Sequence, residues 1–260
     1  MSVCNAVGLI DTNRIVGQDY LDLLSQNERA RYGRMRDAER RKRWAGGRLL
    51  AKYLFLNRFG RQQRSAGFQR IEPFDISALE TFPRWAYREI EILPERWAEG
   101  GLPRLSWAGR ACPVRVSLSH ISGLSGACIS DAGDVGLDLA APALRTPAFY
   151  RANFSKWERD WAEAAARSAG VARERVYTLL WCLKESALKS LQSDHISLWQ
   201  LPRIQVRLRC GGEVLGESRD TSARLRLARA EVSRDGQTWN DAEVSLATTR
   251  QAILTVLRIH

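Results

Sequence analysis

The sequence predicts an α+β fold, because patterns typical of helices and of strands occur in both halves of the chain, with helices preceding strands in each. The length of 260 residues is enough to bury a sizeable core, as one large domain or two small ones. Five cysteines are odd in number and scattered, with no paired metal-ligand spacing, so we expect reduced, mostly buried thiols rather than a disulfide scaffold or a zinc site. They are Cys4, Cys112, Cys128, Cys182 and Cys210.

The first half of the chain predicts helices between strands. A strand is expected at Val3–Ile10, and the pattern over Leu21–Phe59 predicts helices that break near Gly46-Gly47. The segment from 60 to 111 is irregular and rich in Arg, Pro and Trp, and its pattern places no element clearly beyond a strand near Ile71–Ile76. Short strands follow, with 130–133 as a turn between the last two. They are expected at Val114–Leu118, Gly126–Ile129 and Val135–Leu139.

The second half becomes helical after Pro142 and Pro147 and returns to strands beyond Pro202. Ser155 lies three residues before Glu158, which is the spacing of a capping box at the start of a helix. Helices are expected at Ser155–Ser168 and Arg173–Leu191, and strands of a second sheet at Ile204–Leu208, Leu225–Val232 and Ala252–Ile259.

The motif with the most functional information lies in the second of these helices, in WCLKESALK (181–189). At about 3.6 residues per turn, Trp181, Glu185 and Lys189 recur on one face, so an aromatic ring, a carboxylate and an ammonium group project side by side. A Glu and a Lys at this spacing are also common as a solvated helix pair, worth only about a few tenths of a kcal/mol. Taken alone, the motif favours that solvated pair.

Two polar segments upstream change this balance. They are SLSH (117–120) and DVGLDLA (134–140). In the second segment apolar residues alternate with Gly136 and Asp138, which predicts a half-buried strand that carries one carboxylate on its other face. A carboxylate in that place either caps a loop or binds a ligand.

Together with FSKWE (154–158), these segments stand in the order of a known family. SLSH, VGLDLA, FSKWE and WCLKESALK resemble the signature set of the 4′-phosphopantetheinyl transferase superfamily, in its large, monomeric, two-lobed subclass, the surfactin-synthetase-activating type. The stretches Leu24–Arg31 and Gly47–Lys52 are similar to the basic first helices of that family. The resemblance spans residues 24 to 192.

The resemblance implies two pseudosymmetric α+β lobes, each a small, mostly antiparallel sheet with packed helices, and an active site between them. The expected N-terminal lobe, residues 1–134, holds the basic helices and the SLSH strand. The expected C-terminal lobe, residues 135–260, holds Asp138 and the WCLKESALK helix. No clear internal sequence repeat is evident between them.

The resemblance also implies a reaction, the transfer of 4′-phosphopantetheine from coenzyme A to a serine of an acyl, peptidyl or aryl carrier protein, with release of adenosine 3′,5′-bisphosphate. Asp138 and Glu185 would hold Mg²⁺, a hard ion suited to carboxylates, phosphate oxygens and waters. Glu185 would be the general base, directly or through a water, and Lys189 would stabilise charge on the pyrophosphate. The implied coenzyme A ligands are Arg31, Arg43, Arg48, Ser119, His120 and Lys189.

Plainer explanations exist for several of these residues. A lone His at a strand end is more often structural than functional, and only the SLSH match favours a ligand role for His120. A basic helix face is usually solvated, so at most about four of the basic residues between 29 and 52 are expected to contact a ligand. Lys184 is expected to be a surface residue, and Trp181 to pack in the core.

Three departures from the family pattern leave the level of activity open. Ala140 stands where the family usually carries a second acid two residues after the metal aspartate. The glycine-rich turn after the last motif lysine is replaced by residues 191–195, and Leu102 stands where the family has a cation, a contact that Arg104 or Arg110 could supply. Because Asp138 and His120 accompany the helix motif, we favour an active enzyme.

The formal net charge of +11 implies a polyanionic partner, whether nucleic acid, acidic protein or phosphorylated cofactor. A nucleic-acid-binding protein is therefore one alternative, although no recognition-helix, zinc-finger or RNP-like pattern supports it beyond charge. The other alternative is a relative that binds coenzyme A or a carrier protein without turnover, for which Ala140 and the altered turn are the motivation. The carrier protein, the pathway and the role of the 60–111 segment stay open.

The first residues carry neither a basic leader nor a sustained apolar core, and no run approaches the length of a membrane span. A cytoplasmic protein without a membrane partner is expected. A monomer is expected because both lobes lie in one chain.

Overall fold

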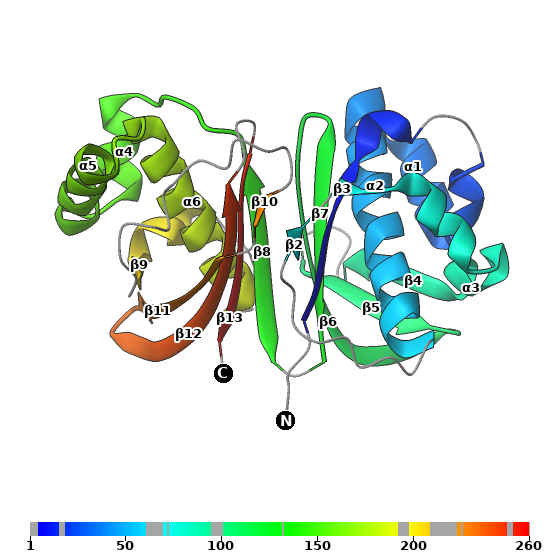
Figure 1. The fold of residues 1–260 in the computed structure, drawn as a ribbon. Helices are drawn as coiled ribbons and strands as arrows, with labels where there is room; N and C mark the ends of the chain where they lie inside the picture. The colour runs from blue at the N-terminus through cyan, green and yellow to red at the C-terminus, as the bar shows by residue number, and fades with distance from the viewer. Residues whose placement is uncertain are drawn as a thin grey trace. The chain divides into compact units, whose positions relative to one another are not determined.

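The computed structural model describes residues 5–15, 19–60, 70–71, 73–94, 101–131, 133–191, 198–208, 223–224, 226–248 and 252–259. The chain divides into two compact units, Met1–Gly133 and Asp134–His260, beside the expected boundary at 134/135. Each unit is a mostly antiparallel sheet with helices packed on it (Figure 1), which confirms the predicted α+β class. Among the described residues no helix is long and apolar enough to cross a membrane.

Unit 1 is a sheet with the strand order β3-β1-β7-β6-β5-β4, in which only the short β3 runs parallel to its neighbour. Helix α2 packs over β1, β7 and β6, and its apolar side chains form a core with those strands. The elements are β1 Asn5–Asp11, α1 Gln26–Arg34, α2 Ala38–Phe55, β2 Arg70–Ile71, β3 Pro73–Phe74, α3 Arg84–Glu89, β4 Ile90–Pro94, β5 Pro103–Trp107, β6 Arg110–Ile121 and β7 Leu124–Ser130, with short helical turns at Thr12–Arg14, Leu21–Leu23, Leu56–Gly60 and Ile76–Thr81.

The expected helix break at Gly46-Gly47 is wrong. Helix α2 runs through both glycines, and the interruption lies before Asp37, whose side chain caps α2. A Cβ on Gly46 would lie 2.8 Å from the Cγ2 of Thr12 and 2.9 Å from the Cδ1 of Ile15. The glycine therefore allows α2 to approach its neighbours closely.

The segment from 60 to 111 holds more structure than the sequence predicts. Near the expected strand lie only the short β2 and β3, but α3, β4, β5 and the start of β6 follow. Pro94 ends the edge strand β4 and Pro103 begins β5, and both are positions at which a strand tolerates proline. Pro94 and Pro103 are therefore strand boundaries, whereas Pro83 precedes α3.

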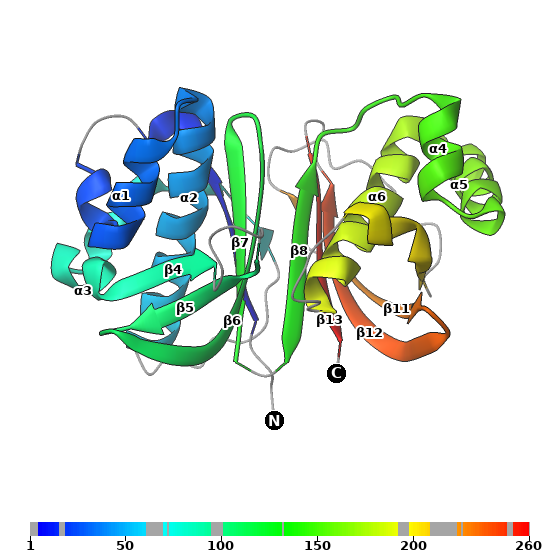
Figure 2. The same ribbon diagram turned by 180° about the vertical axis from the view of Figure 1, so that it is seen from behind.

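Unit 2 is an antiparallel sheet with the order β8-β13-β12-β11-β9. Helix α6 lies on β8, β13 and β9, and α5 packs on α6 (Figure 2). The elements are β8 Asp134–Ala140, α4 Pro147–Asn153, α5 Lys156–Ala169, α6 Arg173–Ser190, β9 Ile204–Leu208, β10 Ala223–Arg224, β11 Arg226–Arg234, β12 Gln237–Thr248 and β13 Ile253–Ile259, with a short helical turn at Leu198–Arg203.

The predicted elements of unit 2 agree closely with α5, α6, β9 and β13, and Ser155 with Glu158 forms the expected capping box. Helix α4 and strand β12 were not predicted. The turn expected at 130–133 does not join two paired strands, because β7 and β8 belong to different sheets.

The two units share one connectivity. When the short β2, β3 and β10 are set aside, a first strand in each unit is followed by helices and then by four antiparallel strands, the last of which returns to pair with the first. β1 thus pairs with β7, and β8 pairs with β13. The strand order is the same when the short β3 is set aside.

The shared connectivity reveals a sequence repeat that inspection of the sequence missed. Val-Gly-Leu occurs in β1 at 7–9 and in β8 at 135–137. The run Leu-Ser-x-x-Glu-Arg at 24–29 recurs as Phe-Ser-x-x-Glu-Arg at 154–159, and both serines cap a helix through a capping box. The repeat is short and widely spaced, so only the fold aligns it.

Candidate active site

Small residues let α6 lie directly against β8. A Cβ on Gly136 would stand 1.8 Å from the backbone oxygen of Ser186, so no residue with a side chain fits there without moving the helix. The Oγ of Ser186 lies 2.7 Å from the Oγ1 of Thr255, and the Oγ of Ser190 donates to the backbone oxygen of Asp134 at 3.1 Å. Side chains alternate along a strand, so Asp138 faces α6 as Gly136 does.

This close approach brings together three residues that the sequence singled out. The Nζ of Lys189 donates to Asp138 Oδ1 at 2.7 Å and to the backbone oxygen of Leu137 at 3.0 Å. Glu185 lies one turn earlier on α6 and, like Asp138, is buried. Two carboxylates and one ammonium group thus form a buried cluster within unit 2, which we call the carboxylate–lysine cluster.

Burial and mutual charge set the ionisation of this cluster. Burial raises the pKa of the Glu185 carboxyl to about 7; Lys189 opposes that rise and Asp138 adds to it. Burial alone would lower the pKa of Lys189, but Asp138 and Glu185 outweigh it, so the pKa lies above its ordinary value. Lys189 therefore stays charged at neutral pH, while Glu185 can exchange a proton there.

Cys182 is a neighbour of the cluster that the family motif does not assign. It is fully buried on α6 within the influence of Asp138, and its Sγ donates to the backbone oxygen of Ile253 at 3.7 Å. Burial raises its pKa well above the ordinary value, and Asp138 adds to this effect. Cys182 is thus a neutral thiol beside the cluster. Cys112 and Cys128 are also free thiols, whereas Cys4 and Cys210 lie outside the described residues.

The surface position expected for Lys184 is wrong. Its Nζ donates to the backbone oxygen of Asn153 at 2.7 Å and to Glu158 Oε2 at 3.2 Å, and its side chain is only 1% exposed. It also lies over the ring of Phe154, 5.3 Å from the centroid. Lys184 therefore joins α6 to the capping box that begins α5. Trp181 packs at the edge of the core, as expected, 5.1 Å from the ring of Phe149.

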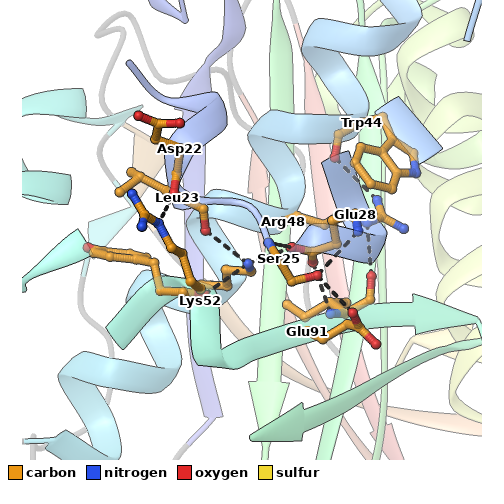
Figure 3. A network of polar contacts seen from close by, with 11 residues as sticks. Asp22, Leu23, Ser25, Glu28, Trp44, Arg48, Lys52 and Glu91 are labelled. Carbon is orange, nitrogen blue, oxygen red and sulfur yellow. Dashed lines mark hydrogen bonds and ion pairs between the residues drawn. The ribbon is translucent and has the colours of Figure 1, made fainter. Parts of the chain in front are cut away.

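Unit 1 contains the same joint (Figure 3). Lys52 of α2 forms a 2.5 Å ion pair with Glu28, the acid of the first capping box, and both side chains are fully buried. Its Nζ also donates to the backbone oxygens of Leu23 and Tyr87, each at 3.0 Å. Leu23 precedes Ser25 by two residues, as Asn153 precedes Ser155, so Lys52 and Lys184 occupy equivalent positions.

Arg48, a candidate coenzyme A ligand, lies against unit 1's own structure. Its Nε donates to the backbone oxygen of Ile92 at 3.0 Å, Nη1 donates to that of Trp44 at 3.2 Å, and the guanidinium stands 3.7 Å from the Trp44 ring centroid (Figure 3). Burial lowers its pKa to about 9; Glu28 opposes this shift and Arg31 adds to it. Arg31 is close enough to repel Arg48, and burial and Arg40 lower the pKa of Arg31 itself.

Arg43 and His120 come to the same end of unit 1. The Oγ of Ser125 in β7 donates to the backbone oxygen of Arg43 at 2.9 Å, and His120 of β6 pairs with Ser125. Directly opposed residues of paired strands point to one face, so His120 faces α2 and Ser119 faces away. His120 is exposed, and the buried Nε of Arg43 has no hydrogen-bond partner among the described residues.

The carboxylate–lysine cluster fits Mg²⁺ as an ion shared with a phosphate ligand. No group of three His, Cys, Asp or Glu side chains gathers for a metal anywhere in the described part of the chain, and Ala140 adds no acid. Mg²⁺ is commonly held by one or two carboxylates together with substrate phosphates and waters. Asp138 and Glu185 supply such a pair, and their mutual repulsion in a buried place favours a cation beside them.

Comparison of the chain with known protein families and with curated proteins found no match. The function is therefore inferred from the residues of the site. The sequence assigned no part in the site to Gly136, Ser186 or Cys182. The sequence signal for Gly136 and Ser186 is the presence of small residues on both elements. Ser186 and Ser190 lie four apart on the helix and Gly136 lies in the strand, and their small size permits close packing.

Proposed function

We propose that this protein is a Mg²⁺-dependent 4′-phosphopantetheinyl transferase that modifies a serine of an acyl, peptidyl or aryl carrier protein. The observation that supports the proposal is the carboxylate–lysine cluster, in which Asp138, Glu185 and Lys189 meet beneath α6. The four motifs and their order supply the reaction class. The net charge of +11 agrees with two anionic substrates, coenzyme A and an acidic carrier protein.

In the proposed reaction, the serine hydroxyl oxygen forms a bond to the phosphorus that carries pantetheine, and the bond from that phosphorus to the bridging oxygen breaks. The bridging oxygen leaves with adenosine 3′,5′-bisphosphate. Glu185, with a pKa of about 7, takes the serine proton directly or through a water. When bound, Mg²⁺ would neutralise charge on the pyrophosphate.

Lys189 and Asp138 have distinct tasks in this proposal. The ammonium of Lys189 stabilises the charge that develops on the pyrophosphate, and Asp138, which accepts from that ammonium at 2.7 Å in this structure, would supply a metal ligand. Because Ala140 supplies no third acid, Asp138 and Glu185 would hold Mg²⁺ together with phosphate oxygens and water.

For coenzyme A phosphates we propose the cations of unit 1. The buried, unpartnered Nε of Arg43 and the exposed His120 support this assignment, as does the mutual repulsion of Arg31 and Arg48. Ser119 is assigned to coenzyme A only because it belongs to the SLSH motif. Arg48 serves this task alongside its structural one, because its guanidinium already binds two backbone oxygens. We place the reaction in the cytoplasm, in line with the free thiols of the described cysteines.

The test is the intact mass of a panel of apo carrier proteins after incubation with this protein, coenzyme A and Mg²⁺. A phosphopantetheine increment is expected with the wild-type protein, and its loss is expected in Asp138→Ala and Lys189→Ala. Asp160→Ala is the matched control, because Asp160 also pairs with a lysine, Lys156, but at an exposed site.

No increment on any acyl, peptidyl or aryl carrier would overturn the transferase proposal. Coenzyme A binding, measured separately by calorimetry, then sorts the alternatives. Binding without transfer identifies a non-catalytic binder. Salt-sensitive affinity for random DNA without coenzyme A binding identifies a nucleic-acid-binding protein.

A further inference from the structure

The ammonium group of Lys189 donates to a carboxylate oxygen of Asp138 that a bound metal ion would also contact. The Nζ to Oδ1 distance is 2.7 Å, and the side chains of Lys189 and Asp138 are only 15% and 9% exposed. The second acceptor of the ammonium is the backbone oxygen of Leu137. This charge-assisted contact is largely shielded from solvent, unlike the exposed helix pair of Lys156 with Asp160.

The fold itself does not require this ion pair. The shared Val-Gly-Leu of β1 and β8 aligns Ile10, a fully buried core residue, with Asp138. Counting onward from the equivalent Lys52 and Lys184 aligns Asn57, which is exposed, with Lys189. Unit 1 thus builds the same sheet and helix without either charge, so a functional reason for the pair in unit 2 is needed.

A cation is nevertheless necessary wherever two carboxylates are buried together. Asp138 and Glu185 repel one another, and Lys189 is the basic group whose charge acts on Glu185. Removing the cation would leave two acids uncompensated in a desolvated place, which is strongly unfavourable. Either Lys189 or a bound metal ion can meet this need.

We propose that Lys189 is a built-in counter-cation, which holds the carboxylate pair while no metal is bound and leaves Asp138 when a divalent cation binds. The displaced ammonium is then free to contact a phosphate beside the metal. The contact with phosphate rests on the proposed function, since the phosphate is taken to be the pyrophosphate of coenzyme A. Metal binding and phosphate binding are coupled through one lysine, and each strengthens the other.

The first test measures the affinity of the metal-free full-length protein for Mn²⁺ and Mg²⁺ by calorimetry. In Lys189→Met the competing cation is gone, so the dissociation constant is expected to fall about tenfold or more. Lys189→Arg keeps the charge and should bind metal about as the wild type does. Lys156→Met, which removes the lysine of the exposed pair with Asp160, should leave the affinity unchanged.

A second readout is the thermal stability of the same proteins. Lys189→Met without metal should melt at a lower temperature than the wild type, and saturating Mn²⁺ should restore most of the loss, because the metal replaces the missing charge. An unchanged or weaker metal affinity in a folded Lys189→Met protein would overturn the proposal.

If Lys189→Met does not fold, the wild type still decides the matter. The ¹⁵N resonance of the Lys189 ammonium should shift on titration with Mg²⁺, and a resonance that stays unmoved while the metal binds contradicts displacement. Carrier modification separates this inference from the proposed function. If the wild type transfers phosphopantetheine but Lys189→Met does not bind metal more tightly, the counter-cation proposal alone is refuted. If Lys189→Met binds metal more tightly but the wild type transfers nothing, the transferase proposal alone is refuted.

Discussion

Glu185 shows how position converts an ordinary carboxylate into a group that titrates near neutrality. The residue is 8% exposed, and burial, aided by Asp138, outweighs the attraction of Lys189. A carboxyl group that is half protonated near pH 7 is suited to accept a proton and to release it within one turnover.

The metal-free protein should lose stability as the pH rises because of Glu185. Its folded-state pKa of about 7 lies above the ordinary value of 4.5, so its contribution is complete below about pH 4.5 and is lost as the pH passes 7. The free energy of unfolding of Glu185→Gln should therefore rise relative to that of the wild type as the pH increases, by about 3 kcal/mol at pH 8. Urea unfolding at pH 5 and pH 8 measures this difference, and curves that stay parallel between the two proteins would contradict the assignment.

At the scale of elements, one joint recurs in both units. A lysine from the long helix, Lys52 or Lys184, enters the capping box of a preceding helix and also binds a backbone oxygen two residues before the cap. In unit 2 the joint fixes α6 just before Glu185. Its recurrence in unit 1, where Tyr53 follows the lysine, indicates a structural role rather than a catalytic one.

Breaking the joint should destabilise the protein strongly. Lys184→Met leaves the buried Glu158 without its cation, and Oε1 of that residue already has no hydrogen-bond partner among the described residues, so a loss of about 3 to 5 kcal/mol is expected in urea unfolding. Lys52→Met should cost as much. The exposed Lys156→Met should cost less than about 1 kcal/mol. Pairing Lys184→Met with Glu158→Gln should recover part of the loss, and its failure to do so would argue against an uncompensated charge.

Gly136 allows the close approach of α6 to β8. Gly136→Ala places a methyl carbon against the backbone of Ser186, so α6 must move off β8, at a cost of about 3 kcal/mol or more. Because Lys189 moves with the helix, carrier modification should be lost even where the variant stays folded. Gly33→Ala is the matched control, since a Cβ there meets no atom within 4 Å. Equal stability of the two variants would contradict the close approach.

Elements with a local sequence signal were predictable, whereas contacts between distant segments were not. Helices α5 and α6 were predictable because a capping box and helical apolar spacing are local signals. The break in α2 was predicted wrongly because glycine served close packing, and β4 and β5 were missed because prolines bounded them. The three members of the carboxylate–lysine cluster were identified by motif. Their contact was not derivable from spacing, since it joins a strand to a helix across about fifty residues.

The burial of Lys184 was missed for a related reason. Lysine is almost never fully buried unless it is paired, and its partner Glu158 lies in another helix. The run FSKWE was recognised as a motif, but nothing in its spacing tied Glu158 to the lysine beside Glu185. Only the equivalent pair in unit 1 makes the pattern evident.

At the scale of the whole molecule, charge is the dominant property. A net charge of +11 creates a positive field that attracts anionic partners before any specific contact forms. If the proposed acidic carrier protein is the partner, the field should act on encounter rather than on chemistry. Salt would then affect the two kinetic constants differently.

The KM for the carrier protein should rise about tenfold between 50 mM and 500 mM NaCl, while kcat changes little. Added salt screens attraction between exposed charges, and the screening length falls from about 10 Å at 0.1 M to about 3 Å at 1 M. The carboxylate–lysine cluster, which is largely shielded from solvent, is screened much less. Steady-state kinetics at fixed Mg²⁺ measures both constants, and a salt effect confined to kcat would contradict steering by the net charge.

The pairing of first and last strands closes each unit on itself. Asn5 at the start of β1 stands opposite Ser130 at the end of β7, and Asp134 at the start of β8 stands opposite Ile259 at the end of β13. The entry and exit of each unit are therefore neighbours, a few ångströms apart. A module of this kind can be joined head to tail, inserted into a loop of a host protein, or given new ends by circular permutation, with a linker of only a few residues.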